Sequence, residues 1–257
     1  MSDCTELLFD FGPQPISNRF LSATDKGMVP KFSAQLGISL ASGPVTLHEP
    51  FFQTDEVCPQ FDWMTCFEPE DHLDELVQKI QGIEGISNTS RIGGFSFKDD
   101  TTLARLAAKG FRNTRRIDPA GDPSIKASGS GIGMLQGASG TLAAMRIRKK
   151  YGPSDVFIVR HGLEHAYNLQ DFCNAVRILL AEESLIIWKI PDCQRALIMG
   201  DCTMFWEKHT CYFTENSFSI FMRASAVQII DQYVVDYLLE NSIVAFTRSL
   251  GVTGADF

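Results

Sequence analysis

The sequence lacks the features that mark secreted and membrane-spanning chains. Its seven cysteines form no Cys-x-x-Cys pair, which argues against a disulfide framework and for free thiols. No apolar run approaches the ~18 residues of a spanning helix. Acids stand in "MSDCTELLFDFG" where a signal peptide carries its positive charge. These absences predict a soluble, cytoplasmic chain without a membrane partner.

Several motifs of ligand-binding proteins are also missing. There is no internal repeat, no helix-turn-helix or zinc-finger pattern, and no Lys-Ser or Lys-Thr ending of a phosphate-binding P-loop. Cys193, Cys202 and Cys211 recur at a regular spacing near His209, but zinc ligands usually come in pairs about two to five residues apart. The sequence therefore predicts no metal site, and it identifies no cofactor and no oligomeric state.

Positive charge is scarce overall but concentrated in one segment. The formal net charge is -8, yet residues 103–154 hold ten basic residues against two acids, Asp118 and Asp122. A local excess of this kind attracts an anionic ligand, although the same side chains could instead pair with the acidic remainder of the chain. Both interpretations stay open. The ten are Arg105, Lys109, Arg112, Arg115, Arg116, Lys126, Arg146, Arg148, Lys149 and Lys150.

The hydrophobic patterns predict an α/β fold with a mixed sheet flanked by helices. Helical spacing marks residues 68–83, and "DVFIV", the amphipathic run after it and "SLIIWKI" predict a βαβ unit in the C-terminal half. Beyond it, "RALIMG", "TMFWEK" and "SFSIFMR" indicate short antiparallel strands, and residues 224–241 indicate a closing helix. We expect an N-terminal portion, 1–126, a linker or lid, 127–141, and a C-terminal portion, 142–257, which could also form one continuous domain.

The expected linker or lid is rich in glycine and serine. Its glycines, among them Gly131 and Gly133, precede the basic helix predicted for "TLAAMRIRKKYG", an arrangement that could wrap a phosphate. However, "RRIDPAGDPSIK" before it is a poor strand, and a dinucleotide-binding loop needs a strand there. The pattern therefore favours a linker or lid over a nucleotide loop.

The strongest candidate for a site is "IVRHGLEHAYN", where a strand ends and a helix follows. Such positions bind anions in α/β sheets, and Arg160 would grip two oxygens while His161 acts as nucleophile or proton donor. These residues resemble the Arg-His-Gly signature of the histidine phosphatase superfamily. That resemblance implies that His161 accepts a phosphoryl group, that Arg160 neutralises its charge, and that a second histidine, His209 or less plausibly His165, takes part.

Together these features predict a protein that binds a phosphate-bearing or otherwise anionic small ligand, with phosphoryl transfer or hydrolysis through His161. Two alternatives stay open. One is a non-catalytic regulatory or interaction domain with a basic partner surface, and the other is a nucleotide- or tRNA-using transferase that binds short RNA. The expected catalytic residues are His161 and His209, and the expected ligand-binding residues are Arg160, Arg146, Arg148, Arg115, Arg116, Gly131 and Gly133.

Overall fold

The computed structural model confirms the α/β class. It describes residues 5–17, 21–24, 27, 29–39, 43–49, 69–118, 121–122, 140–238 and 240–249. A six-stranded sheet has the order β5-β4-β6-β7-β10-β9, in which β4, β5, β6 and β7 are parallel and β10 is antiparallel to both of its neighbours. The bounds are β4 (Arg91–Gly94), β5 (Asn113–Arg116), β6 (Ser154–Arg160), β7 (Leu180–Asp192), β9 (Val227–Val235) and β10 (Asn241–Ser249).

The strand order reverses between β4 and β6. From β4 the chain continues to β5 on one side, and later strands are added on the other side, so this sheet is doubly wound. Ligands of such sheets bind outside the carboxyl ends of the strands, at this point of reversal. The fold itself thus directs attention to the residues that follow β4, β5, β6 and β7.

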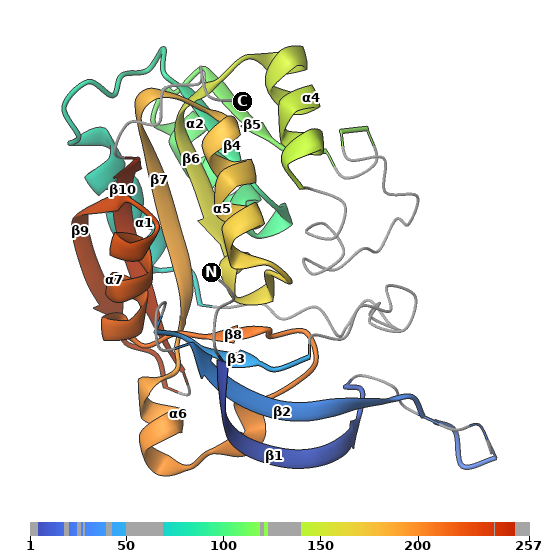
Figure 1. The fold of residues 1–257 in the computed structure, drawn as a ribbon. Coiled ribbons are helices and arrows are strands. Elements are labelled where there is room, and N and C mark those ends of the chain that lie inside the picture. Colours follow the sequence, from blue (N-terminus) through green and yellow to red (C-terminus); the bar gives the residue numbers. More distant parts are fainter. Residues whose placement is uncertain are drawn as a thin grey trace.

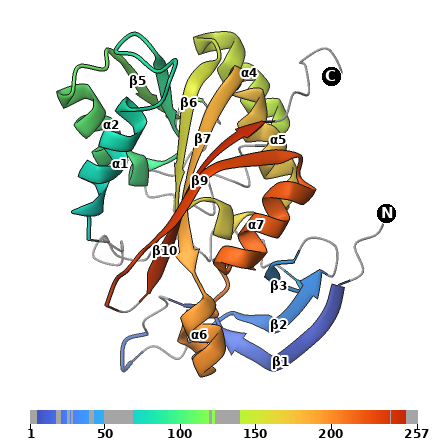
Figure 2. The same ribbon diagram turned by 90° about the vertical axis from the view of Figure 1, so that its left-hand side faces the viewer.

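Helices cover both faces of the large sheet. Figure 2 shows the sheet between α1 and α2 on one side and α4, α5 and α7 on the other. The bounds are α1 (His72–Gln81), α2 (Asp100–Ala108), α4 (Thr141–Tyr151), α5 (Leu169–Ile178), α6 (Gln194–Met199) and α7 (Glu215–Ala224), with single-turn helices η2 (Phe97–Asp99), η3 (Leu163–His165) and η4 (Cys202–Met204).

The central strands are buried on both faces, as parallel strands between helices must be. Along β6, Val156 and Ile158 pack against α1 and α2, whereas Phe157 and Val159 pack against α4 and α5. Trp188 of β7 joins the second layer. The two hydrophobic layers fix the strands, and therefore fix the residues at their carboxyl ends.

A second, antiparallel sheet lies beyond the carboxyl ends of β6 and β7, beside α6 (Figure 1). Its order is β1-β2-β3-β8, from β1 (Thr5–Pro15), β2 (Lys31–Ser39), β3 (Val45–Leu47) and β8 (Cys211–Tyr212). Strand β8 is the next strand in the sequence after β7 of the large sheet, so the chain passes directly from the large sheet to the small one. The small sheet has its own core, which includes Phe32, Leu36, Leu47 and Tyr212.

Four predicted elements of the C-terminal half are wrong. "RALIMG" and "SFSIFMR" lie in helices α6 and α7, "TMFWEK" is the end of η4 followed by a turn, and most of the predicted closing helix is strand β9. Helix α7 begins with a capping box, in which Thr214 accepts from the backbone N–H of Ser217 and Ser217 accepts from that of Thr214. The expected βαβ unit is confirmed as β6, α5 and β7.

Strands from both predicted portions of the chain join the large sheet, β4 and β5 from the first and β6 onward from the second. Most of the predicted linker, 127–141, lies outside the described residues, including Gly131 and Gly133. Within the described ranges, no helix is long and apolar enough to cross a membrane.

Candidate active site

Three charged or titratable side chains, Arg160, His161 and Lys189, lie together at the carboxyl ends of β6 and β7. Arg160 pairs with Lys189 across the two parallel strands, and the backbone N–H of His161 donates to the carbonyl of Lys189 at 2.8 Å. Neighbouring residues on a strand point to opposite faces, so Arg160 and His161 turn in different directions. His161 turns toward the same side of the site as the Lys189 ammonium, 3.1 Å from it.

Lys189, His161 and Glu164 form a hydrogen-bonded chain, the Lys-His-Glu chain. The Nζ of Lys189 lies 3.1 Å from Nε2 of His161, and Nδ1 of His161 lies 3.1 Å from Oε1 of Glu164. Lys189 also donates to Oγ of Ser242 at 3.0 Å. An ammonium that donates to Nε2 leaves the imidazole proton on Nδ1, where it is donated to the carboxylate. The chain can therefore shift a proton between its members.

The Lys-His-Glu chain is sheltered at both ends and open in the middle. Lys189 is fully buried and Glu164 is 2% exposed, whereas the side chain of His161 is 18% exposed. Burial alone would raise the pKa of Glu164, but other effects, of which the hydrogen bond from His161 is the largest, lower it to about 2. A buried anion thus faces a buried cation across a histidine that a ligand can reach.

His161 has an unusual backbone. Its φ of 49° lies in the left-handed region, which a non-glycine residue adopts at an energetic cost of about 1–3 kcal/mol. Gly162 follows, where an added Cβ would meet Cγ1 of Val159 at 2.9 Å. Strain of this kind gathers at functional sites, and here it turns the imidazole toward Lys189 and Glu164.

The loop after β4 forms the neighbouring wall of the site. Gly93 allows close packing of β4 on β6, because an added Cβ would lie 2.4 Å from Cδ2 of Phe157. Beyond it, the backbone N–H groups of Phe95 and Ser96 both donate to Oδ2 of Asp99 at 2.8 Å, and that of Arg160 donates to Oδ1 at 3.0 Å. A phosphate loop needs such N–H groups for its ligand. Here the protein's own carboxylate takes them.

Asp118 comes two residues after β5, at the same edge of the sheet. It accepts the backbone N–H of Gly121 at 3.1 Å, and it lies in the exposed part of the structure. In doubly wound sheets an acid about 20 residues beyond the first strand-to-helix turn binds the hydroxyls of a ribose. Asp118 is the first acid after β5 at this edge of the sheet.

Arg160 is a buried structural side chain. It is 1% exposed, and its guanidinium donates to the carbonyl of Lys98 and to Oγ1 of Thr101 and Thr102, the last two at 3.0 and 3.1 Å. Its other terminal nitrogen lies 3.7 Å from Oε1 of Glu70. The guanidinium that was predicted to bind phosphate thus makes its hydrogen bonds within the protein.

The remaining predicted arginines do not converge on Arg160. Arg148 donates to the carbonyls of Ile178 and Leu180, where β7 begins, at the opposite end of the sheet from Arg160, and Arg146 is exposed on α4. Arg116 lies 2.7 Å from Asp100, and Arg115 lies 3.4 Å from Asp122. Much of the basic segment therefore pairs with protein groups, which is the second of its two interpretations.

His209, the other predicted catalytic residue, lies close to the Lys-His-Glu chain. Its imidazole packs against that of His165 with ring centroids 4.8 Å apart, and both approach Glu164. The structure thus brings His161 and His209 to the same carboxylate. Their catalytic roles stay a prediction.

Sequence reasoning missed Lys189, Glu164 and Asp99 as site residues. The signal for Lys189 was present, because it is the one charged residue in "SLIIWKI", a run that was correctly predicted as a buried strand. A charge inside such a run requires a partner. No comparable signal marked Asp99, whose importance depends on three backbone groups brought together by folding.

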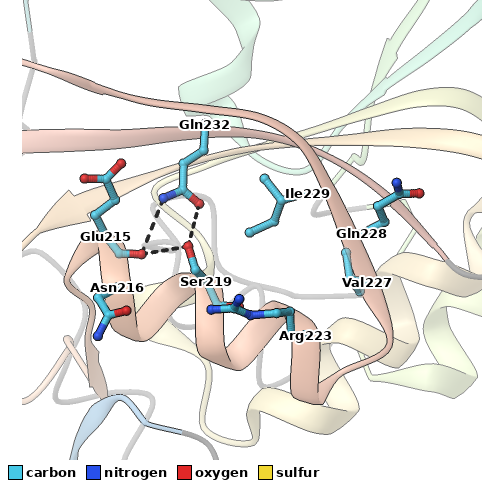
Figure 3. A pocket seen from close by; sticks show the side chains of 8 residues that line it. All are labelled: Glu215, Asn216, Ser219, Arg223, Val227, Gln228, Ile229 and Gln232. Atoms are coloured by element: carbon cyan, nitrogen blue, oxygen red, sulfur yellow. Dashed lines mark hydrogen bonds between the residues drawn. The ribbon is translucent and has the colours of Figure 1, made fainter.

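A separate pocket of about 750 Å³ lies between α7 and β9. Figure 3 shows Gln232 and Ser219 hydrogen-bonded at 3.1 Å on its rim, with Arg223 extending along it. It contains no member of the Lys-His-Glu chain. Its lining residues are Glu215, Asn216, Ser219, Arg223, Val227, Gln228, Ile229 and Gln232.

Comparison with known proteins identifies similar folds only. No model of a protein family matches the sequence, and no curated protein is significantly similar to it. Among solved structures, 1,6-didemethyltoxoflavin-N1-methyltransferase of Burkholderia thailandensis, with bound S-adenosylhomocysteine, is 9% identical, with 93% of this chain and 99% of that chain covered and a TM-score of 0.49.

Two further solved structures are similar over a smaller share of this chain. An S-adenosylmethionine-dependent methyltransferase of Clostridium acetobutylicum is 12% identical, covering 72% of this chain and 93% of its own, with a TM-score of 0.47. A structure named as a cyclase is 8% identical, covering 68% and 80%, with a TM-score of 0.46. Similarity at this level assigns no reaction to this chain.

The prediction of a phosphate-handling protein is wrong, and so is the associated prediction of phosphate binding. Four of the similar solved structures are named as methyltransferases, three of them as S-adenosylmethionine-dependent, and none of the four is named for phosphoryl chemistry. In the structure, Asp99 occupies the loop N–H groups and the protein engages Arg160, so the two features expected to hold a phosphate are used internally.

Asp99 makes stability depend on pH. Burial raises its pKa to about 7, although the hydrogen bonds from Ser96, Arg160 and Phe95 act against this. Because the folded protein holds this proton more tightly than the unfolded chain, the free energy of unfolding should fall as the pH rises from about 4 to about 7. We expect Asp99→Asn to remove up to about 4 kcal/mol of this dependence in urea unfolding between pH 4 and 8.

Asp155→Asn provides the matched control. The hydrogen bonds and charge of Arg91 outweigh burial and lower the pKa of Asp155, so its contribution should instead be lost as the pH falls. Equal pH profiles for Asp99→Asn and the wild type would contradict the assignment.

Proposed function

We propose that this chain is a transferase that uses S-adenosylmethionine to methylate a hydroxyl or amine of a small molecule. The observation that carries the proposal is the Lys-His-Glu chain at the carboxyl ends of β6 and β7, beside the point where the strand order reverses. That position is where doubly wound sheets bind nucleoside-containing ligands. A proton relay at the same place suits the activation of a nucleophile.

The donor set around the site fits a cation better than a phosphate. Asp118 follows β5, where it is positioned for ribose hydroxyls, and buried Asp99 takes the N–H groups of the loop after β4. Glu164 and Glu240 add acidic groups near His161. S-adenosylmethionine carries a ribose and a positively charged sulfonium but no phosphate, and when bound it supplies an electrophilic methyl group.

The protein's own residues would manage the proton. A hydroxyl or amine that is methylated must lose a proton, and Nε2 of His161 would accept it. Glu164 accepts a hydrogen bond from the Nδ1–H of His161 and would stabilise the imidazolium, as the carboxylate of a catalytic triad does. Burial of Lys189 and Glu164 keeps water from replacing these contacts.

Calorimetric titration with S-adenosylmethionine and S-adenosylhomocysteine tests the proposal. We expect both to bind the wild type, and we expect Asp118→Ala to weaken binding at least ~10-fold through loss of the ribose contact. Asp74→Ala, an exposed acid of α1, should bind as the wild type does. Absence of binding by the folded wild-type protein would refute the proposed donor.

The basic segment gives no support for RNA as the acceptor. Arg115, Arg116, Arg148 and Lys150 already contact carboxylates or carbonyls of the protein. A nucleic-acid surface needs several basic groups that can exchange their counterions for phosphates. We therefore propose a small-molecule acceptor.

A further inference from the structure

Three potential metal ligands meet beside the Lys-His-Glu chain. Glu164, His165 and His209 each offer one donor atom, and these atoms lie within 4.8 Å of one another. Glu164 and His165 belong to η3, directly after β6, whereas His209 lies in the segment that leads into β8 of the small sheet. Folding thus assembles the cluster from segments more than 40 residues apart in the sequence.

Backbone contacts hold the two segments in place. The N–H of Thr210 donates to the carbonyl of Glu164 at 2.8 Å, and Oγ1 of Thr210 donates to the carbonyl of Ala166 at 2.6 Å. Thr210 is 2% exposed, so these bonds are protected from water. The three donor atoms therefore converge in a fixed frame, which lowers the cost of organising a binding site.

His165 is oriented as a metal-binding histidine is. Its Nδ1 lies 2.6 Å from the carbonyl oxygen of Lys208. A carbonyl only accepts, so Nδ1 carries the proton and the lone pair of the ring is on Nε2. Metal-ligating histidines commonly donate their second ring nitrogen to a backbone carbonyl in this way.

The buried carboxylate of Glu164 gives a second, independent indication of a bound ligand. Its Oε1 accepts from His161, but its buried Oε2 has no hydrogen-bond partner among the residues that the structure describes. A buried carboxylate oxygen without a partner is costly, and buried charges in proteins are usually paired or bound to metal. The same carboxylate contributes one oxygen to the group of donor atoms with His165 and His209.

The charge states agree with this geometry. Burial lowers the pKa of His209 to about 3 and also lowers that of His165, so both imidazoles are neutral at pH 7. Glu164 is ionised. Neutral imidazole and carboxylate are the forms in which these side chains bind metals.

We infer that Glu164, His165 and His209 bind one divalent transition-metal ion of the zinc class. Two imidazole nitrogens and one carboxylate oxygen suit zinc, whereas magnesium and calcium prefer oxygen ligands alone. Donor atoms around tetrahedral zinc lie about 3.3 Å apart for bonds of about 2.0–2.1 Å, so binding draws the three side chains inward. Water completes the coordination, and His209 is only half-buried, so the ion has a path to the site.

This site differs from the sequence-based expectation of no metal, and it stands independently of the proposed methyl transfer. The regular spacing of Cys193, Cys202 and Cys211 is the feature of the sequence that could suggest a metal site. The proposed ligands are instead two histidines and a carboxylate. Bound metal would tie η3 to the small sheet and would hold the carboxylate that accepts from His161.

Zinc titration of the full chain, stripped with a chelator and monitored by calorimetry and a competing chromophoric chelator, tests the site. We expect one Zn²⁺ per chain in the wild type and at least ~100-fold weaker binding in His209→Ala and Glu164→Gln. His48→Ala removes an exposed histidine after β3 and should bind zinc as the wild type does. Mg²⁺ and Ca²⁺ should give no saturable binding.

X-ray absorption at the zinc edge separates this site from a cysteine site, since we expect nitrogen and oxygen donors without sulfur. Sulfur donors would overturn the inference, as would zinc binding in both variants equal to that of the wild type, or no stoichiometric binding by the wild type. Circular dichroism of the metal-free variants verifies their folding. Glu164→Gln, which keeps the side-chain shape, serves as the test if His209→Ala does not fold.

Discussion

Lys189→Met is expected to slow methyl transfer by about 10²–10⁴-fold while S-adenosylmethionine still binds. Methionine fills the volume of the lysine but cannot donate a hydrogen bond, so His161 loses the ammonium group that contacts its Nε2 and fixes the proton on Nδ1. The ribose contact that we propose for Asp118 belongs to another strand end and should be unaffected. Radiolabelled methyl transfer to a panel of small hydroxyl and amine compounds measures the rate, and calorimetry measures binding.

Lys79→Met is the matched control for this substitution. Lys79 lies on α1, where it contacts Asp231 at 2.9 Å on the surface, and its replacement should leave transfer unchanged. Since surface ion pairs contribute about 0–1 kcal/mol, this control should also fold normally. A Lys189→Met protein that is folded, binds the donor and retains a tenth or more of the wild-type rate would contradict the assigned role.

The part of the fold that was predicted correctly has strong local signals. Strand β6, helix α5 and strand β7 were found because a short apolar run, an amphipathic stripe and a second apolar run follow one another. In such a unit the conformation that each segment favours locally is the one that it adopts in the fold. For the same reason the sequence predicts that Arg160 and His161 lie at the end of a strand.

The errors came where tertiary contacts override the local pattern. Val227 to Val235 has apolar residues at spacings that also fit a helix, but pairing with β10 makes it the edge strand β9. "SFSIFMR" is rich in β-formers, yet the Thr214 capping box and burial of Phe218 and Met222 make it helix α7. The composition of these segments shows neither that β9 pairs with β10 nor that the capping box outweighs the β-forming residues of α7.

The place of His161 directly after a strand is predicted by the sequence, but its contact with Lys189 is not. Lys189 comes from the next strand and becomes adjacent only through the register of β6 and β7. The charge of the basic segment was similarly misleading as a guide to ligands. Whether an arginine faces solvent, a carbonyl or a carboxylate depends on packing that a one-dimensional pattern does not contain.

Arg160→Met is expected to lower the free energy of unfolding by about 3–5 kcal/mol, the range for breaking a buried charge interaction. The substitution leaves Oγ1 of Thr102 and the carbonyl of Lys98 without their donor, and it removes the positive charge nearest the buried Asp99. It therefore disturbs the junction of β6 with η2 and α2. Urea unfolding at constant pH measures this loss.

Arg146→Met separates a structural role from a general effect of removing positive charge. Arg146 is exposed on α4, and replacing it should change the free energy of unfolding by less than about 0.5 kcal/mol. Phosphorylated metabolites should shift the melting temperatures of the wild type and both variants equally, because the Arg160 guanidinium is engaged within the protein. A shift specific to the wild type and lost only in Arg160→Met would instead show that this arginine contacts a ligand.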